Sequence, residues 1–561
     1  MEETPPQGKN DLVKRSIHLL TTLLDEQLPH IHTFRGKWSL IRTKLTDLNT
    51  HLHDLADFHS SFHSDFLCAD VLSSVLLTLT DTLSLAGRCR NHHLTEGKLK
   101  TQSEIDSVIA KLDRHIKDSE ILFRSGVLQD AAVSTSDLSA VCSKREALRV
   151  EMRNMLTRLQ IGTFDSKSEA LDALLGLLNE DDKNVSIAVA QDLMPVLVRL
   201  LDSSSPDMKE KTVAVIASIS AIDSSEHVLV SEGLLLLNHL IRILESGSGF
   251  AKERACVALQ ALSLSKENAR TIGTRGGISS LLEICQSGTP SSQAVAAGVL
   301  RNLAQIEEIK ENFVEENAIF VLIALSSSGT ALAKENAFGC LSNLVSNDVS
   351  LKILVAREGG IESLKNYWDS TPAGWSMQTA VELLRNLASL HPVGQSLISE
   401  GFIGKVMAAL SCGILGVRIA AAGAVYELGF SSKSQKEIGE CGSVAPLVRM
   451  LDGKVTEERE AAAKALSRLM VYAGNQKIFK KEERGIVNAV LLLDPLTQSL
   501  DKRWPVSLLA SLVGSKKCRK LMVAAGACVY LQKLVELDVD GARKLLQSLG
   551  RGKLWGVFAR A

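Results

Sequence analysis

The sequence has few aromatic residues and no paired cysteine motif. Aromatic side chains make up only 4% of the 561 residues, although 45% of the residues are hydrophobic. The core therefore has to be built from Leu, Ile, Val and Ala, as in stacked helices. The ten cysteines are scattered and form no CxxC pair. This pattern is typical of single cysteines that act as small core hydrophobes in a reducing compartment.

An excess of one charge is also lacking. The chain has 63 basic and 64 acidic residues and a formal net charge of −1. A protein that binds nucleic acid through its phosphates needs a clustered excess of Lys and Arg. We therefore predict no nucleic-acid partner.

Signals for secretion and membrane insertion are missing. The first residues, Met1-Glu2-Glu3, do not resemble a signal peptide and offer no glycine for N-myristoylation. No uninterrupted apolar run reaches the roughly 18 residues of a spanning helix. We expect no integral membrane insertion and a soluble, cytoplasmic protein, with a nuclear share left open.

Motifs of common catalytic and metal sites are absent as well. There is no GxSxG, P-loop or HExxH sequence, and Gly247-Ser248-Gly249 is a lone GxG that we interpret as a turn. Ten of the thirteen histidines precede residue 120, and His59 and His63 have the i, i+4 spacing of a metal-binding pair. Because no third ligand accompanies that pair, we interpret the histidines as solvated polar faces. We predict no enzyme, no cofactor and no metal.

A repeat of about 42 residues dominates what is present. An apolar-x-x-apolar pattern recurs with steps of 41 to 43 residues, and its first residue falls at Met194, Leu237, Ile278, Ile319, Ile361, Ile403, Val444, Val487 and Cys528. Self-similarity at such a period is the signature of a solenoid, in which each unit packs only on its neighbours. The sequence therefore predicts an all-α repeat array over residues 164–561, of about nine units.

Residues 1–163 do not follow this period. Apolar residues from Trp38 to Leu55 alternate three and four apart, which predicts a helix with one narrow seam. Similar patterns predict further helices around residues 12–28, 68–86, 105–116 and 138–159. We expect an antiparallel helical bundle that precedes the array.

Each repeat unit divides into a short helix, a second helix and a longer third helix. The first helix usually ends at a glycine, such as Gly276 or Gly401, and at Asn317 in one unit. A sharp joint there requires positive φ, which Gly and Asn tolerate. The third helices carry the sequences Arg-Asn-Leu-Ala at 301–304 and 385–388, and Leu-Ser-Asn-Leu at 341–344.

These features resemble the armadillo repeat, and the resemblance covers about 70% of the chain. It implies a right-handed superhelix whose third helices line a concave groove. It also implies that an asparagine on each third helix binds the backbone of an extended peptide. A primary amide suits that role because it both donates and accepts hydrogen bonds. The corresponding positions here hold Ser218, Ala261, Asn302, Asn343, Asn386, Glu427, Arg468 and Ser511.

We therefore predict a peptide site at Asn302, Asn343 and Asn386. The alternative is structural, because an asparagine near a helix end can satisfy local carbonyl groups. Arg301 and Arg385 adjoin these asparagines and could favour acidic ligand residues, although arginines on a helix face are more often simply solvated.

The sequence departs from the pattern of nuclear-import adaptors, which resemble it in the asparagines. Those proteins place tryptophan four residues before each asparagine, and here the positions hold Gly298, Gly339 and Glu382. The aromatic slots for lysine are therefore missing, and a receptor for nuclear localisation signals is disfavoured. At the two glycines we expect a wider and smoother surface.

The first 163 residues resemble the N-terminal domain of plant U-box/armadillo proteins, in part through Arg124-Ser125-Gly126-Val127-Leu128. The U-box expected next is not visible, because residues 134–162 indicate a continuous helix. The resemblance implies a plant scaffold that holds protein partners through both its groove and its bundle. A substrate adaptor that works with a separate ubiquitin ligase is the alternative.

The last segment, residues 539–561, mixes apolar residues such as Leu545, Leu549 and Trp555 with five basic ones. We interpret it as a helix that caps the array. Peripheral contact with an acidic membrane is the alternative.

Overall fold

The computed structural model describes residues 9–57, 62–90, 97–125, 140–222, 229, 232–370, 377–482, 484–497 and 499–550. Every regular element in these ranges is a helix, which confirms the predicted all-α class. The chain divides into two compact units, residues 1–262 and 263–561. The predicted domain boundary at residues 163 and 164 stays a prediction.

The first unit begins with a helical bundle. Its helices are α1 (Lys9–Thr21), α2 (Arg35–Asp57), α3 (Phe62–Arg90) and α4 (Lys98–Arg124). Helix α1 packs on α3 and α2 packs on α4. The seam predicted on α2 is the core of this bundle, because Ile41, Leu45 and Leu48 have no exposed surface. After α1 the chain continues as a π turn (Thr22–Gln27) and a 3-10 turn (Leu28–His30), so the helical segment runs through Pro29, where the sequence predicted its end, to His30.

Helix α5 (Ala140–Ile161) lies where a U-box would follow the bundle. It packs mainly against α6 (Phe164–Glu180), and α6 packs against the third helix of the first repeat. The predicted helix is therefore confirmed for residues 140–161, whereas residues 134–139 lie outside the described part. The repeats continue from this helix pair.

The first residue of each of the nine apolar-x-x-apolar patterns lies in the second helix of its repeat unit. The second helices are α8 (Leu193–Leu200), α11 (Gly233–Ser246), α14 (Gly277–Ser287), α17 (Ala318–Ser328), α20 (Gly360–Ser370), α23 (Phe402–Leu410), α26 (Val444–Met450), α29 (Gly485–Leu491) and α32 (Ala527–Glu536). The 42-residue period thus marks the same structural position in every unit.

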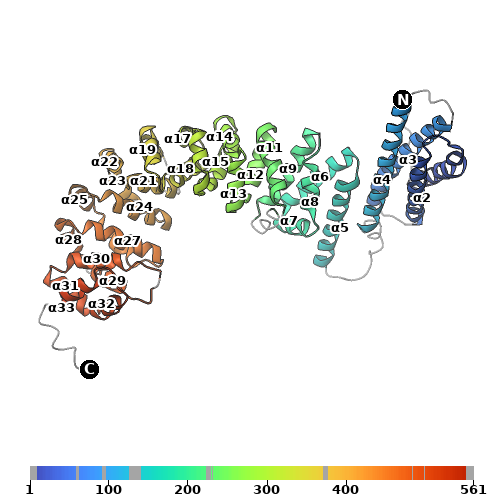
Figure 1. The fold of residues 1–561 in the computed structure, drawn as a ribbon. Helices are drawn as coiled ribbons and strands as arrows, with labels where there is room; N and C mark the ends of the chain where they lie inside the picture. Colours follow the sequence, from blue (N-terminus) through green and yellow to red (C-terminus); the bar gives the residue numbers. More distant parts are fainter. Residues whose placement is uncertain are drawn as a thin grey trace. The chain divides into compact units, whose positions relative to one another are not determined.

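The third helices carry the packing from one unit to the next. They are α9 (Pro206–Ser220), α12 (Gly249–Leu262), α15 (Pro290–Leu303), α18 (Ala331–Val345), α21 (Gln378–Ala388), α24 (Leu415–Leu428), α27 (Thr456–Leu469), α30 (Arg503–Leu512) and α33 (Ala542–Gly550). In the second unit α15, α18, α21, α24, α27 and α30 contact one another in that order (Figure 1). Adjacent third helices therefore form a continuous row.

The first helices are short and connect the units. They are α7 (Asp182–Val189), α13 (Lys266–Thr274), α16 (Lys310–Glu315), α19 (Val349–Arg357), α22 (His391–Ser399), α25 (Ser432–Glu440), α28 (Ala473–Phe479) and α31 (Lys516–Ala524). The joint after them has positive φ, as predicted: 83° at Gly276, 82° at Gly401 and 54° at Asn317. Asp192 adopts the same conformation, with φ of 55°, without a sequence signal that marked it.

The final helix, α33, packs against α30 and α32 and buries Leu545 and Leu549. This position fits the predicted cap. Residues 551–561, which include Trp555, lie outside the described part of the chain, and so does the membrane alternative for the tail.

One described helix segment, Leu67–Arg90, is long and apolar enough to cross a membrane by length and composition. The search for uninterrupted apolar runs missed it because polar residues interrupt the sequence. Its residues Leu67, Leu72 and Leu79 are fully buried in the bundle core, as expected for a core helix of a folded domain.

A histidine is buried between two helices of the bundle. His115 on α4 is 4% exposed, and its Nε2 lies 2.8 Å from the hydroxyl oxygen of Thr78 on α3. Burial, with a smaller contribution from the positive charges of Arg114 and Lys111, lowers the pKa of His115 from 6.5 to about 4. The imidazole is therefore neutral in the folded bundle at neutral pH.

We expect the bundle to lose stability as the pH falls from 6.5 to about 4. In that window the unfolded chain binds a proton at His115 and the folded bundle does not, so the free energy of unfolding falls by up to about 3 kcal/mol. Amide hydrogen-exchange protection of α3 and α4 in the full chain measures this loss. The variant His115→Gln cannot titrate and should show a flatter dependence. An equal decline in the variant and the wild type would contradict the assignment.

Candidate partner-binding site on the third helices

The structure places the three predicted asparagines on adjacent helices. Asn302 lies in α15, Asn343 in α18 and Asn386 in α21, each within the last turn of its helix, and all three are half-buried. We call these three residues the amide ladder. Because α15 packs on α18 and α18 on α21, their amides follow one another along the row.

Each ladder amide binds the preceding unit. Asn343 Nδ2 donates to the backbone oxygen of Arg301 at 3.0 Å. Asn386 Nδ2 donates to the backbone oxygen of Ser342 and to the Ser342 hydroxyl, both at 3.0 Å. Asn302 Nδ2 donates to the hydroxyl oxygen of Ser263 at 2.9 Å.

These bonds satisfy carbonyl groups that the helix itself leaves open. The last four carbonyls of an α-helix have no partner within the helix, and Arg301 and Ser342 lie in the last turns of α15 and α18. After Arg301 the chain turns tighter, because the N–H of Gln305 donates to Asn302 instead. Asn343 and Asn386 thus have a structural role toward the preceding third helix, which differs from the predicted alternative of bonds to local carbonyl groups.

A primary amide has more capacity than this. It carries two N–H donors and an oxygen with two lone pairs. Asn343 and Asn386 are half-buried and use Nδ2 toward the preceding helix. The amide oxygen of each can therefore serve a ligand while Nδ2 holds the neighbouring unit.

Arg301 covers the glycine at the position where import adaptors have tryptophan. A Cβ atom added to Gly339 would lie 2.6 Å from Nε and 2.7 Å from Cδ of Arg301. The guanidinium Nη1 also lies 3.5 Å from Oδ1 of Asn336, a buried residue whose Nδ2 binds the backbone oxygen of Ala294. The expectation of an open surface at Gly339 is therefore wrong, because the arginine of the preceding unit fills it.

The same relation recurs along the row. An added Cβ at Gly423 on α24 would lie 2.5 Å from Cδ of Arg385. One unit later, Tyr426 lies against Lys464, with 4.4 Å from the ammonium nitrogen to the ring centroid. We use ladder position for the residue of each third helix that corresponds to these asparagines. In each of the three pairs, the first residue directly precedes the ladder position of its own helix. The residue that it covers lies on a later third helix, four positions before the ladder position of that helix. Arg301 and Arg385 are thus part of the packing between units as well as neighbours of the ladder.

Aromatic and cationic side chains gather where the asparagines end. Besides Lys464, the guanidinium carbon of Arg468 lies 4.3 Å from the centroid of Tyr426. The rings of Tyr426 and Trp504 meet edge to face, with centroids 5.6 Å apart. We call Tyr426, Lys464, Arg468 and Trp504 the cation–aromatic cluster. Of these four residues, only Arg468 stands at a position that the sequence pattern marked. Tyr426 on α24, Lys464 on α27 and Trp504 on α30 were not predicted.

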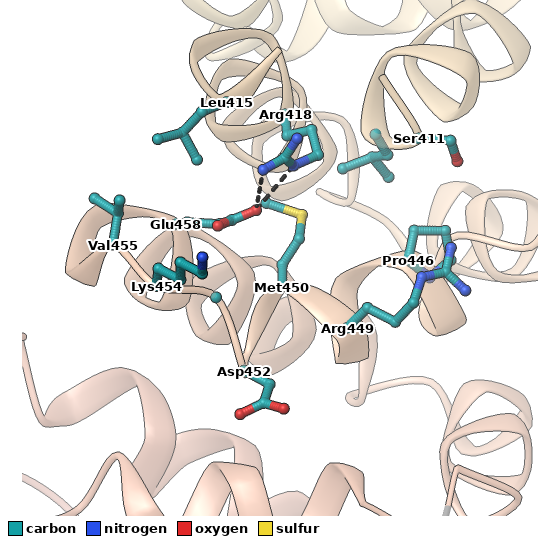
Figure 2. Close-up of a pocket in the computed structure, with 12 residues that line it drawn as sticks. Ser411, Leu415, Arg418, Pro446, Arg449, Met450, Asp452, Lys454, Val455 and Glu458 are labelled. Atoms are coloured by element: carbon teal, nitrogen blue, oxygen red, sulfur yellow. Dashed lines mark hydrogen bonds and ion pairs between the residues drawn. The ribbon is translucent and has the colours of Figure 1, made fainter. Parts of the chain in front are cut away.

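A separate cavity of about 530 Å³ lies between the sixth and seventh units. Figure 2 shows Arg418 pointing toward Glu458, with Met450 and Leu415 beside them. Arg418 Nε donates to Glu458 Oε1 at 2.8 Å, and Arg418 Nη1 donates to the backbone oxygens of Cys412 and Gly413, both at 3.0 Å. The polar groups at its centre are therefore already paired, and none of the predicted site residues lines it.

The described residues hold no group of three or more His, Cys, Asp or Glu side chains placed to bind a metal. His59 and the side chain of His63 lie outside what the structure describes, so that pair is untested. Six of the described cysteines are buried, but Cys441 is exposed and departs from the predicted core role. Burial raises the pKa of the Cys285 thiol to about 12, which disfavours the reactive thiolate.

Comparison with known proteins gives a match for each part of the chain. A family model described as "Domain of unknown function (DUF7032)" matches residues 14–127, which cover the bundle. No curated protein matches. An engineered protein of known crystal structure is 23% identical, with a TM-score of 0.60, and the match covers 72% of this chain and 98% of that one.

Designed armadillo repeat proteins are also similar, over a shorter stretch. One is 20% identical with a TM-score of 0.38, and covers 42% of this chain and 98% of its own. Another, solved in complex with the peptide (KR)4, is 18% identical with a TM-score of 0.38, and covers 42% of this chain and 99% of its own. The helices of the array form an all-α repeat fold.

We expect Gly339→Ala to displace Arg301 and to stabilise the array less than an unhindered glycine replacement. Alanine favours a helix interior over glycine by about 1 kcal/mol, but its Cβ would collide with the Arg301 stem. Gly404 on α23 is the control, because an added Cβ there meets no atom within 4 Å. Urea unfolding of the full chain should show a gain for Gly404→Ala and a smaller gain or a loss for Gly339→Ala. Equal gains would refute the packing role of Arg301.

Proposed function

We propose that this protein is a scaffold whose amide ladder captures the backbone of an extended segment of a partner protein. The observation that carries the proposal is the register of three half-buried amides on adjacent third helices. Packed helices lie about 10 Å apart, and an extended chain advances about 3.3 Å per residue. One amide would therefore meet every third peptide residue, which is a repeat that an extended backbone can follow.

The chemistry of this capture is hydrogen bonding without reaction. The amide oxygen of Asn343 or Asn386 accepts from a peptide N–H, while Nδ2 continues to hold the preceding helix. The binding unit is thus built into the contact that fixes the helices, so it needs little ordering when the peptide arrives. Arg301 and Arg385, held over Gly339 and Gly423, flank the path.

The bundle is the second proposed partner surface, and the cytoplasm is the proposed location. The domain match to the bundle names no function, so its partner is left open. The adaptor role beside a separate ubiquitin ligase stays a prediction of the sequence resemblance alone.

We expect Asn343→Ala to weaken peptide binding, whereas Asn336→Ala should not. Both substitutions remove an amide that binds a carbonyl of α15 from α18, at 3.0 Å and 2.9 Å. Each should lower the free energy of unfolding by about 1 kcal/mol. Asn336 is only 6% exposed, so it cannot reach a peptide on the surface, and it controls for the loss of packing.

The measurement uses peptides of about 16 residues selected from a random display library on the immobilised full chain. Their affinity for Asn343→Ala should fall about tenfold, which corresponds to about 1.4 kcal/mol for the lost hydrogen bonding. Their affinity for Asn336→Ala should stay within about twofold of the wild type. A library that yields no binder, or equal losses in both variants, would count against the proposal.

A further inference from the structure

Two like charges lie side by side on α27, and no described carboxylate lies within 4 Å of the charged nitrogens of either. Lys464 and Arg468 are four residues apart on this helix, a spacing at which like charges repel. Within the described residues neither side chain takes part in an ion pair or donates a hydrogen bond. Both instead lie over the ring of Tyr426, at 4.4 and 4.3 Å from its centroid.

One donor of this pair is buried and unsatisfied. Nε of Arg468 has no hydrogen-bond partner although the atom is inaccessible to solvent. The stem of Arg468 packs on the end of α24 in the preceding repeat unit, because a Cβ added to Gly429 would lie 3.1 Å from Cγ of Arg468. The guanidinium is therefore held in place and lacks an acceptor. A carboxylate is the acceptor whose geometry matches a guanidinium with two parallel bonds.

The nearby acidic residues are otherwise placed. Asp501 binds Arg503, with 2.6 Å between Asp501 Oδ2 and Arg503 Nη2, and Glu460 accepts the backbone N–H of Asp501 at 3.4 Å. Glu427 follows Tyr426 on α24 and makes no ion pair with Lys464 or Arg468 within 4 Å. Asp501 lies close enough to Lys464 for the two charges to interact, because Arg503 first and Lys464 to a smaller extent lower the pKa of Asp501. No described carboxylate forms an ion pair with Arg468.

Aromatic rings also border the two cations on α27. Trp504 packs edge to face on Tyr426, and Lys464 lies 5.3 Å from the Trp504 centroid. Tyr426, Lys464, Arg468 and Trp504 are all half-buried and come from three successive third helices. An aromatic wall beside two fixed cations excludes water from one side, which strengthens an ion pair formed there.

We propose that the cation–aromatic cluster binds an acidic side chain of the same extended peptide whose backbone lies on the amide ladder. This inference rests on the proposed function and adds its sequence preference. Arg468 occupies the ladder position two units beyond Asn386, which at about 10 Å per unit is about 20 Å away. The acidic residue would thus lie about six peptide residues from the one at Asn386.

The test measures fluorescence anisotropy of two labelled peptides, (Glu-Ser)8 and (Gln-Ser)8, against the full chain. The two peptides match in length and shape and differ in charge. Sixteen residues suffice to span from α15 to α30, a path of about 50 Å. We expect (Glu-Ser)8 to bind at least about tenfold more tightly than (Gln-Ser)8 at about 0.15 M salt, and the difference to shrink at higher salt.

The variant Lys464→Met/Arg468→Gln removes both charges and keeps most of the side-chain volume. It should bind (Glu-Ser)8 about tenfold more weakly and (Gln-Ser)8 unchanged. The control is Lys516→Met/Lys520→Gln, because these lysines are also four residues apart on one helix, α31, and are exposed. It changes the net charge by the same amount and should leave both affinities within about twofold. Circular dichroism of both variants checks that they are folded.

Each outcome decides between the two proposals. Equal affinity of the wild type for the two peptides, or equal losses in both double variants, would overturn the acidic preference and leave the ladder standing. Binding of (Glu-Ser)8 that depends on Lys464 and Arg468 but not on Asn343 would support the cluster and overturn the ladder. Competition by a 16-nucleotide single-stranded DNA or by phosphatidylserine vesicles that matches the peptide in strength and dependence on Arg468 would reassign the cluster away from a peptide.

Discussion

The contact between one third helix and the next is the interaction on which the second compact unit, residues 263–561, depends. These helices carry fully buried small residues, such as Ala296 and Ala297 on α15 and Ala421 and Ala422 on α24, and small residues allow helices to approach closely. Close approach brings the side chains of one helix to the last turn of its neighbour, where carbonyl groups lack partners. A donor has to be supplied there, because an unsatisfied carbonyl in a packed interface is costly.

The side chains that bond to the ends of the third helices come from different places along the row. In the middle units the ladder amides of Asn343 and Asn386 bind the preceding helix. In the later units the first helix that follows supplies the donor, as when Gln435 binds the backbone oxygen of Gly429. Further bonds of this kind run from Asn475 to Leu469, from Gln476 to Met470 and from Arg519 to Val513.

In the later units the ladder position no longer holds asparagine. It holds Glu427 on α24, Arg468 on α27 and Ser511 on α30. The last ladder asparagine, on α21, binds the end of α18, and bonds from a following first helix are found from the end of α24 onward. The ladder positions change from amides to charged residues over the same stretch of the array.

Much of the fold could be predicted because the period repeats local signals. A missing Cβ or an Asn side chain marks the joints at Gly276 and Asn317, whereas Asp192 adopts the same conformation without such a signal. The packing of Arg301 on Gly339 was not predicted, since it joins residues 38 positions apart and needs the offset between neighbouring helices. The same offset joins Arg385 to Gly423 and Tyr426 to Lys464, so the sequence contained a pattern that a comparison within single units overlooks.

That offset also changes the meaning of the missing tryptophans. In an array with tryptophan at the position of Gly339, the aromatic face would be open to a ligand's lysine stem. Here a cation from the preceding unit covers the glycine, and at Lys464 a cation stands in the tryptophan position itself, with the aromatic ring supplied by the preceding unit. The protein thus supplies both the ring and the cation of this contact. A surface that provides its own cations over its own rings has no place for a basic peptide, and the charge that remains to be supplied is negative.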